Sequence, residues 1–175
     1  MQIRLAGIVK ESVVDGPGIR MVVFVQGCPH HCPGCHNENT QDPSGGYLST
    51  VQEVIDLLPA NSLITGLTFS GGEPFLQADA LAEIGRAARQ RGLSIFTYTG
   101  FVFETLLEQS RSNADIAALL AVTDVLIDGP FLLEQRDISL AFRGSGNQRL
   151  LDVPASGKGW DGAMLPGVPG DRWFA

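Results

Sequence analysis

Short apolar runs alternate along the chain with segments of helical periodicity. The runs predict strands at residues 21–26, 63–71, 93–100 and 124–129, with a further candidate at 148–153. Helical spacing covers residues 50–59, 77–92, 101–110 and 113–122. Strands that alternate with helices indicate a parallel α/β sheet, and the continuous apolar run at 21–26 is typical of a strand buried on both faces.

Local signals set several element ends. Thr50 and Glu53 have the spacing of a capping box, and Pro59 ends the helix that begins there. The helix at 77–92 places Leu81, Ile84 and Ala88 on one face and ends at Gly92. The segment at 3–9 is expected to pair at an edge of the sheet.

Composition narrows the class of protein. A chain of 175 residues with 44% hydrophobic residues forms one domain with a real core, since domains run to roughly 100–200 residues. The net charge of −7 speaks against a nucleic-acid-binding surface. The sequence has neither an apolar run of about 18 residues nor a secretory signal, so we expect no membrane span and a cytoplasmic location. Residues 154–175 are rich in Gly and Pro and are predicted to form a loosely ordered tail.

One short loop holds every cysteine and every histidine of the chain. It reads QGCPHHCPGCHN at 26–37 and contains Cys28, Cys32 and Cys35. Three interpretations stay open: a Cys3His zinc site, a redox Cys-x-x-Cys pair, and an iron–sulfur cluster one protein ligand short. In the third, one iron is free to bind another molecule.

The unusual turns all follow predicted strands. The cysteine loop follows the strand at 21–26, and the turns SGGEP (70–74), TYTG (97–100) and DGPF (128–131) follow the next three strands. Because the carboxyl ends of parallel strands meet at one edge of a sheet, we expect these four turns to share one site.

Taken together, these motifs resemble a known family. Cys-x3-Cys-x2-Cys followed by SGGEP resembles the radical S-adenosylmethionine superfamily. The segments VDGPGIRMVVFVQGCPHHCPGCHN, TFSGGEPF, LIDGPF and FRGSGNQRL resemble the activating enzymes of anaerobic ribonucleotide reductases. The similarity runs from residue 5 to 151 and implies a small, incomplete, TIM-like parallel α/β barrel. It assigns residues 1–153 to a radical S-adenosylmethionine domain and leaves 154–175 as a tail.

The resemblance also implies a site and a reaction. Cys28, Cys32 and Cys35 would ligate a catalytic [4Fe-4S] cluster whose open iron takes the amino and carboxylate groups of S-adenosylmethionine. The other implied cofactor contacts are Gly34, Cys35 and His36 near the adenine, Ser70, Gly71, Gly72 and Glu73 near the methionine amino group, and Asp128. The resulting 5′-deoxyadenosyl radical would generate a glycyl radical on the large subunit of anaerobic ribonucleoside-triphosphate reductase. Flavodoxin or ferredoxin would donate the electron.

Two alternatives are weighed against this function. An activase of pyruvate formate-lyase or another glycyl-radical enzyme would carry Asp-Thr-Asn-Gly and Asp-Leu-Lys where this chain has TYTG and DGP, so the lysine is missing and only Asp128 remains. A non-catalytic zinc adaptor would explain the cysteine loop but not SGGEP.

Several single residues have less definite interpretations. His30 and His31 are interpreted as solvent-facing filler between ligands. The remaining polar candidates for contact with the cofactor or the partner are Tyr98, Thr99, Arg143, Asn147, Gln148 and Arg149.

Overall fold

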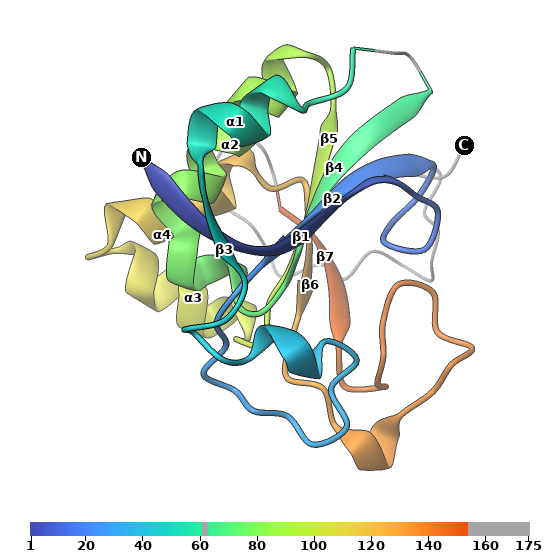
Figure 1. Cartoon of the computed structure of the whole chain (residues 1–175). Coiled ribbons are helices and arrows are strands. Elements are labelled where there is room, and N and C mark those ends of the chain that lie inside the picture. The colour runs from blue at the N-terminus through green and yellow to red at the C-terminus, as the bar shows by residue number, and fades with distance from the viewer. Residues whose placement is uncertain (61–62, 154–175) are drawn as a thin grey trace.

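A seven-stranded sheet organises residues 1–60 and 63–153, which the computed structural model describes (Figure 1). The strands are β1 (Gln2–Ser12), β2 (Ile19–Val25), β3 (Tyr47–Thr50), β4 (Ile64–Gly71), β5 (Ser94–Tyr98), β6 (Val125–Asp128) and β7 (Arg149–Asp152). Their order across the sheet is β3-β1-β2-β4-β5-β6-β7. The tail predicted at 154–175 lies outside the described residues.

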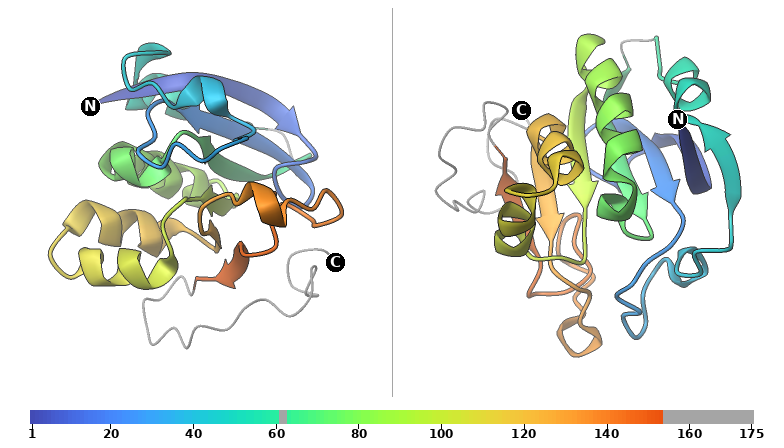
Figure 2. Two further views of the ribbon diagram at one scale, coloured as in Figure 1. Left: turned by 90° about the horizontal axis from the view of Figure 1, so that it is seen from below. Right: turned by 90° about the vertical axis from the view of Figure 1, so that its left-hand side faces the viewer.

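Four helices cover one face of this sheet, as the two views of Figure 2 show. They are α1 (Val51–Asp56), α2 (Ala78–Gln90), α3 (Phe103–Ser110) and α4 (Ala114–Val122). Three single 3-10 turns, η1 (Glu38–Thr40), η2 (Pro74–Gln77) and η3 (Leu133–Gln135), lie in the connections. The opposite face of the sheet carries loops instead of helices within the described part of the chain.

The strand pairing confirms the α/β class and refines it. β2, β4, β5 and β6 pair in parallel, as predicted. β1, β3 and β7 pair antiparallel, so the sheet is mixed, and over the described residues it remains open and forms no closed barrel. The incomplete barrel expected from the resemblance is therefore an open, mixed sheet of seven strands.

The expectation that residues 3–9 form an edge is wrong. β1 lies between β2 and β3, because the short strand β3, which the sequence pattern did not reveal, pairs along its outer side. Ile3 and Leu5 are 1% and 0% exposed, so β1 alternates into the core as an interior strand does.

The predicted capping box forms at the start of α1. The Thr50 backbone N–H donates to Glu53 Oε2 at 2.8 Å, and the Glu53 N–H donates to Thr50 Oγ1 at 3.2 Å. The Asn113 side chain caps α4 by accepting from the next helical N–H groups, which separates α3 from α4. The predicted face of α2, with Leu81, Ile84 and Ala88, is buried.

Two apolar clusters lie on the two faces of the sheet. Ile95 and Leu126 belong to the larger cluster beneath the helices, whereas Phe96, Val125 and Ile127 belong to a smaller one. Because neighbours along a strand point to opposite faces, the smaller cluster packs the helix-free face. No helix among the described residues is long and apolar enough to cross a membrane.

Candidate active site

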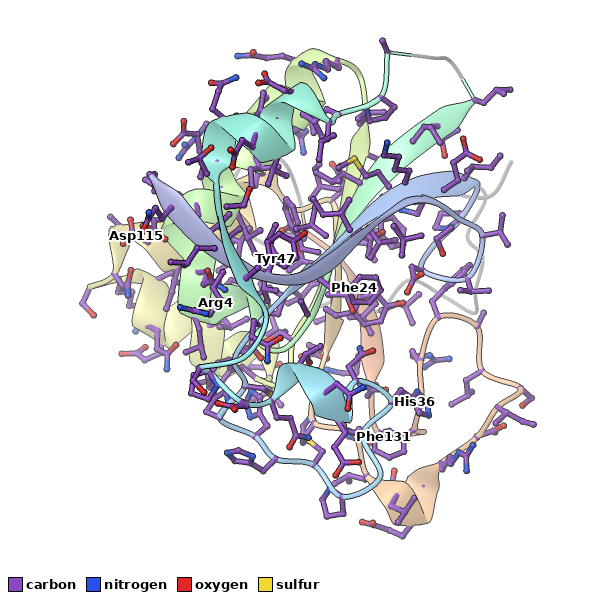
Figure 3. All side chains as sticks on the ribbon, viewed as in Figure 1. Arg4, Phe24, His36, Tyr47, Asp115 and Phe131 are labelled. Atoms are coloured by element: carbon purple, nitrogen blue, oxygen red, sulfur yellow. The ribbon has the colours of Figure 1, made fainter. Side chains whose placement is uncertain are left out.

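A cavity of about 550 Å³ opens at the carboxyl ends of the parallel strands. Every predicted turn contributes to its wall: the cysteine loop after β2, the end of β4, the Tyr98–Gly100 turn after β5, and Gly129 with Phe131 after β6. The prediction that the four turns share one edge of the sheet is therefore confirmed. The labelled side chains Phe24, His36 and Phe131 mark this region in Figure 3.

The three cysteines are free, half-buried, and all line this cavity. The Cys28 N–H donates to the Gln41 carbonyl at 3.0 Å, and the Cys35 N–H donates to the Cys32 carbonyl at 3.2 Å, which closes a turn between them. The Asn37 N–H points at Cys35 Sγ at 3.4 Å. Burial raises the pKa of the Cys28 thiol above its ordinary value, because the cavity wall disfavours the charged thiolate.

The donor set fits an iron–sulfur cluster better than a single ion. A structural zinc site needs four ligands, each about 2.0–2.3 Å from the same point. Among the described residues, no three His, Cys, Asp or Glu side chains converge in this way. A [4Fe-4S] cluster binds each thiolate through a different iron, so its protein ligands need not meet at one point, and Cys28, Cys32 and Cys35 all line the same cavity.

The glycines of SGGEP allow the end of β4 to touch the start of the cysteine loop. A Cβ at Gly72 would lie 2.2 Å from the Gly27 carbonyl oxygen, and one at Gly71, where φ is +101°, would lie 2.5 Å from the Val25 carbonyl oxygen. The Gly72 N–H donates to Val25 at 2.8 Å. Ser70, Gly71 and Gly72 all line the cavity, so their backbone is open to a ligand.

Glu73 follows them but turns away from the cavity and is fully buried. Its Oε1 accepts from the Phe75 N–H at 3.0 Å and from Thr99 Oγ1 at 2.9 Å. Its Oε2 accepts from the Gly100 N–H at 2.8 Å and lies 2.9 Å from His30 Nε2. Protein donors therefore surround the carboxylate that the resemblance assigned to the methionine amino group.

The interpretation of His30 as filler is wrong. Its imidazole bonds to Glu73, packs edge-on against Phe101 with ring centroids 4.6 Å apart, and is only 17% exposed. Sequence spacing gave no hint of this because the partners lie more than 40 residues away. His31, in contrast, is exposed and contacts Gln41.

His36 and Phe131 face each other across one end of the cavity, with ring centroids 5.2 Å apart (Figure 3). Gly34, with φ of +72°, lies against Phe131 and Leu133, since a Cβ there would meet the Leu133 side chain at 3.0 Å and Phe131 at 3.6 Å. The two ring planes are tilted by 46° and lie too close for a base to enter between them, so they form one aromatic surface at this end of the cavity.

The structure does not bring Asp128 to the cavity wall. Its side chain is 1% exposed, accepts from the Phe103 N–H at the start of α3 at 2.7 Å, and pairs with Arg149. Arg149 also pairs with Glu104, and these carboxylates raise the pKa of its guanidinium. Asp128 and Arg149 thus join β6, α3 and β7.

The segment after β6 closes another side of the cavity. Asn147 donates to the Pro130 carbonyl at 2.8 Å, and the Gln148 side chain donates to the Gly129 carbonyl and accepts from the Gly144 N–H. Arg143 lines the cavity and is the only Lys or Arg among its described lining residues. The Arg143 Nε is buried without a hydrogen-bond partner.

The β1–β2 loop also contributes to the cavity wall, which the sequence pattern did not reveal. Val14 and Asp15 line the cavity, and the Asp15 carbonyl accepts from Thr68 Oγ1 at 2.8 Å. Thr68 in turn accepts from Arg20, whose guanidinium is fully buried over the Phe96 ring, and burial lowers the pKa of Arg20 to about 10. The charged Arg20, directly before the apolar run at 21–26, was the available signal in the sequence.

Comparisons with known proteins agree with this site. A family model described as a 4Fe-4S single cluster domain matches residues 14–151. The anaerobic ribonucleoside-triphosphate reductase-activating protein of Vibrio cholerae is 40% identical, with 78% of this chain and 90% of that protein covered. The protein of the same name from Enterobacteria phage T4 is 37% identical over 78% of this chain and 86% of its own length.

Two further matches are more distant or more partial. The pyruvate formate-lyase 1-activating enzyme of Escherichia coli is 38% identical, but only 66% of this chain and 47% of that enzyme are covered. The crystal structure of QueE from Escherichia coli matches with a TM-score of 0.45 and 16% identity over 57% of this chain and 53% of that chain. The family model and the first relatives show that this chain belongs to the family of anaerobic ribonucleoside-triphosphate reductase-activating proteins, with a 4Fe-4S single cluster domain.

Proposed function

We propose that this protein generates a glycyl radical on anaerobic ribonucleoside-triphosphate reductase by reductive cleavage of S-adenosylmethionine. The observation that carries the proposal is the single cavity shared by three cysteines and the glycine backbone at the end of β4. The chain has only three cysteines. They leave one corner of a four-iron cluster for a ligand that is not protein.

Cys28, Cys32 and Cys35 would hold the cluster from one wall of the cavity. When bound, the cluster supplies the electron that breaks a sulfur–carbon bond of S-adenosylmethionine and releases a 5′-deoxyadenosyl radical. The loop keeps its thiols in place through the backbone bonds from Cys28 to Gln41 and from Cys35 to Cys32. The Asn37 N–H at Cys35 Sγ would stabilise the thiolate by a charge-assisted hydrogen bond.

The other walls offer groups for each part of the cosubstrate. Backbone atoms of Ser70, Gly71 and Gly72 would meet the methionine amino group, since glycines permit close approach. The Arg143 guanidinium would pair with the methionine carboxylate because it is the one Lys or Arg among the described residues of the wall and its Nε lacks a partner. The adenine would stack on the aromatic surface that His36 and Phe131 form.

A protein substrate needs an open approach to this cavity. The β1–β2 loop contributes Val14 to the cavity wall, and the segment after β6 contributes Leu140 and Phe142. Phe142 packs against the smaller apolar cluster on the face of the sheet without helices. We propose that the loop of the reductase that carries the target glycine enters the cavity from this side. An external flavodoxin or ferredoxin would supply the electron, and the closely spaced free cysteines favour the reducing cytoplasm.

The two alternative functions, an activase of formate-lyase and a zinc adaptor, explain fewer features of the sequence and the site. The formate-lyase activase match spans under half of that enzyme, and this chain lacks the lysine expected after β6. A zinc adaptor would account for the cysteine loop but gives no reason for the backbone of Ser70, Gly71 and Gly72 on the wall of the same cavity.

Anaerobic reconstitution with iron and sulfide tests the function. After reduction with S-adenosylmethionine present, we expect 5′-deoxyadenosine, and a glycyl-radical signal in electron paramagnetic resonance spectra when anaerobic ribonucleotide reductase is added. Formate-lyase serves as the control substrate. Protein that forms no 5′-deoxyadenosine, or that activates formate-lyase and not the reductase, would contradict the proposal.

A further inference from the structure

We propose that Glu73 is a positioning residue that anchors the cysteine loop through His30, and that its carboxylate does not bind the amino group of S-adenosylmethionine. This inference rests on the proposed function for the identity of the cofactors. The anchor itself is a property of the polypeptide and can be measured without them.

The hydrogen-bonding capacity of the Glu73 carboxylate is fully used. An ionised carboxylate has about four acceptor positions and no donor. The Phe75 N–H, the Thr99 hydroxyl, the Gly100 N–H and His30 Nε2 fill these positions at 2.8–3.0 Å. An ammonium group would have to displace one of them, and the side chain is 0% exposed and absent from the cavity wall.

The contacts of the His30 ring fix its position next to Glu73. Because the carboxylate only accepts, the Nε2 of His30 carries the proton in this bond. The ring also packs edge-on against Phe101. A Cβ at position 100 would lie 2.3 Å from the His30 imidazole. The glycine in the turn after β5 therefore leaves the space that the ring occupies.

The anchor joins the two walls that hold the cofactors. His30 lies between the proposed iron ligands Cys28 and Cys32, and Glu73 follows the cavity-lining Gly72. The Glu73 N–H also donates to the Gly27 carbonyl at 2.8 Å, so both its backbone and its side chain hold the cysteine loop. Losing the His30 bond should loosen this loop in the free protein and weaken its hold on the cluster.

The first test uses the protein without cluster, so it is independent of the proposed function. Hydrogen exchange of the 28–36 segment is compared in wild type, His30→Ala, His30→Gln and His31→Asn. His30→Ala should exchange about tenfold faster. His30→Gln, whose amide N–H replaces Nε2, should recover most of the protection. His31→Asn is the matched control, because Asn tolerates the left-handed φ of +46° at this exposed position.

The second test separates anchoring from amino-group binding in reconstituted protein. Iron retained after gel filtration and the dissociation constant of S-adenosylmethionine are measured for His30→Ala, Glu73→Gln and the double variant. We expect both single variants to lose cluster severalfold faster, the double variant to add little, and cosubstrate affinity per cluster to stay within threefold of wild type. A Glu73→Gln variant with full cluster and more than tenfold weaker cosubstrate binding, or unchanged exchange in His30→Ala, would overturn the inference. If wild type bound no iron, the proposed function would fail while the exchange result would still decide the anchor.

Discussion

Replacing Asp128 with Asn separates structural from cofactor-binding roles at the end of β6. The resemblance assigned this carboxylate to the cofactor, whereas the structure buries it between Arg149 and the Phe103 N–H. Asn has the same shape but only one acceptor oxygen. Asp128 Oδ2 accepts from both the Phe103 N–H and Arg149, and Oδ1 accepts from the Arg149 Nε–H, so an NH2 group loses least in place of Oδ1. There it faces the Arg149 Nε–H, and at least one contact to Arg149 is lost.

The size of the effect follows from these contacts. Hydrogen bonds to charged groups contribute about 1.5–3 kcal/mol, and removal of one partner of a buried ion pair costs about 3–5 kcal/mol. Arg149 is 30% exposed and keeps its pairing with Glu104, which argues for the lower part of this range. We expect about 2–3 kcal/mol of lost unfolding free energy, or roughly 4–12 °C in Tm for a chain of this size.

Urea unfolding followed by circular dichroism, with protein free of metal and kept reduced, measures this change. Asp115→Asn is the control because this exposed carboxylate lies in the first turn of α4 (Figure 3), where its loss costs about 0.3–1 kcal/mol. Binding of S-adenosylmethionine per cluster should not change in Asp128→Asn. Unaltered stability together with weaker cosubstrate binding would refute the structural role.

Further substitutions test other parts of the account. Arg143→Gln should weaken S-adenosylmethionine binding about tenfold without changing iron content, since one charge-assisted contact is lost; equal dissociation constants would exclude the proposed carboxylate pairing. Thr50→Ala should lower the unfolding free energy by about 0.5–2 kcal/mol through loss of the capping box, and a change below about 0.3 kcal/mol in urea unfolding would argue against it. Gly100→Ala should displace His30 and speed cluster loss on gel filtration, whereas Gly7→Ala, with open space around the new methyl group, should retain iron like wild type.

Strands with a continuous buried run were predictable from the sequence. An exposed edge strand was not, and neither was the position of the strand that pairs with it. The buried runs at 21–26 and 63–71 correspond to β2 and β4 within about two residues. β3 escaped prediction because Tyr47 and Leu48 are exposed at the sheet edge and show no alternation. Because β3 was not predicted, the position of β1 between two other strands could not be predicted either.

The convergence of the four turns was predictable because parallel strands place their carboxyl ends together. The environments of individual carboxylates were not. Glu73 gains its donors from positions 30, 75, 99 and 100, and Asp128 gains Arg149 only because β7 returns antiparallel to β6. Such hydrogen-bond partners are set by tertiary packing, so a local sequence motif does not predict them.

The central claim is that three thiolates leave one iron open for S-adenosylmethionine. Electron–nuclear double resonance on the reduced, reconstituted protein measures it directly, with the cosubstrate labelled by ¹⁵N at its amino group and ¹⁷O at its carboxylate. The account predicts hyperfine coupling of both labels to the cluster, and none when the label is moved to the adenine. A cluster that shows no coupling to either label, or that keeps about four irons after Cys32→Ser, would contradict it.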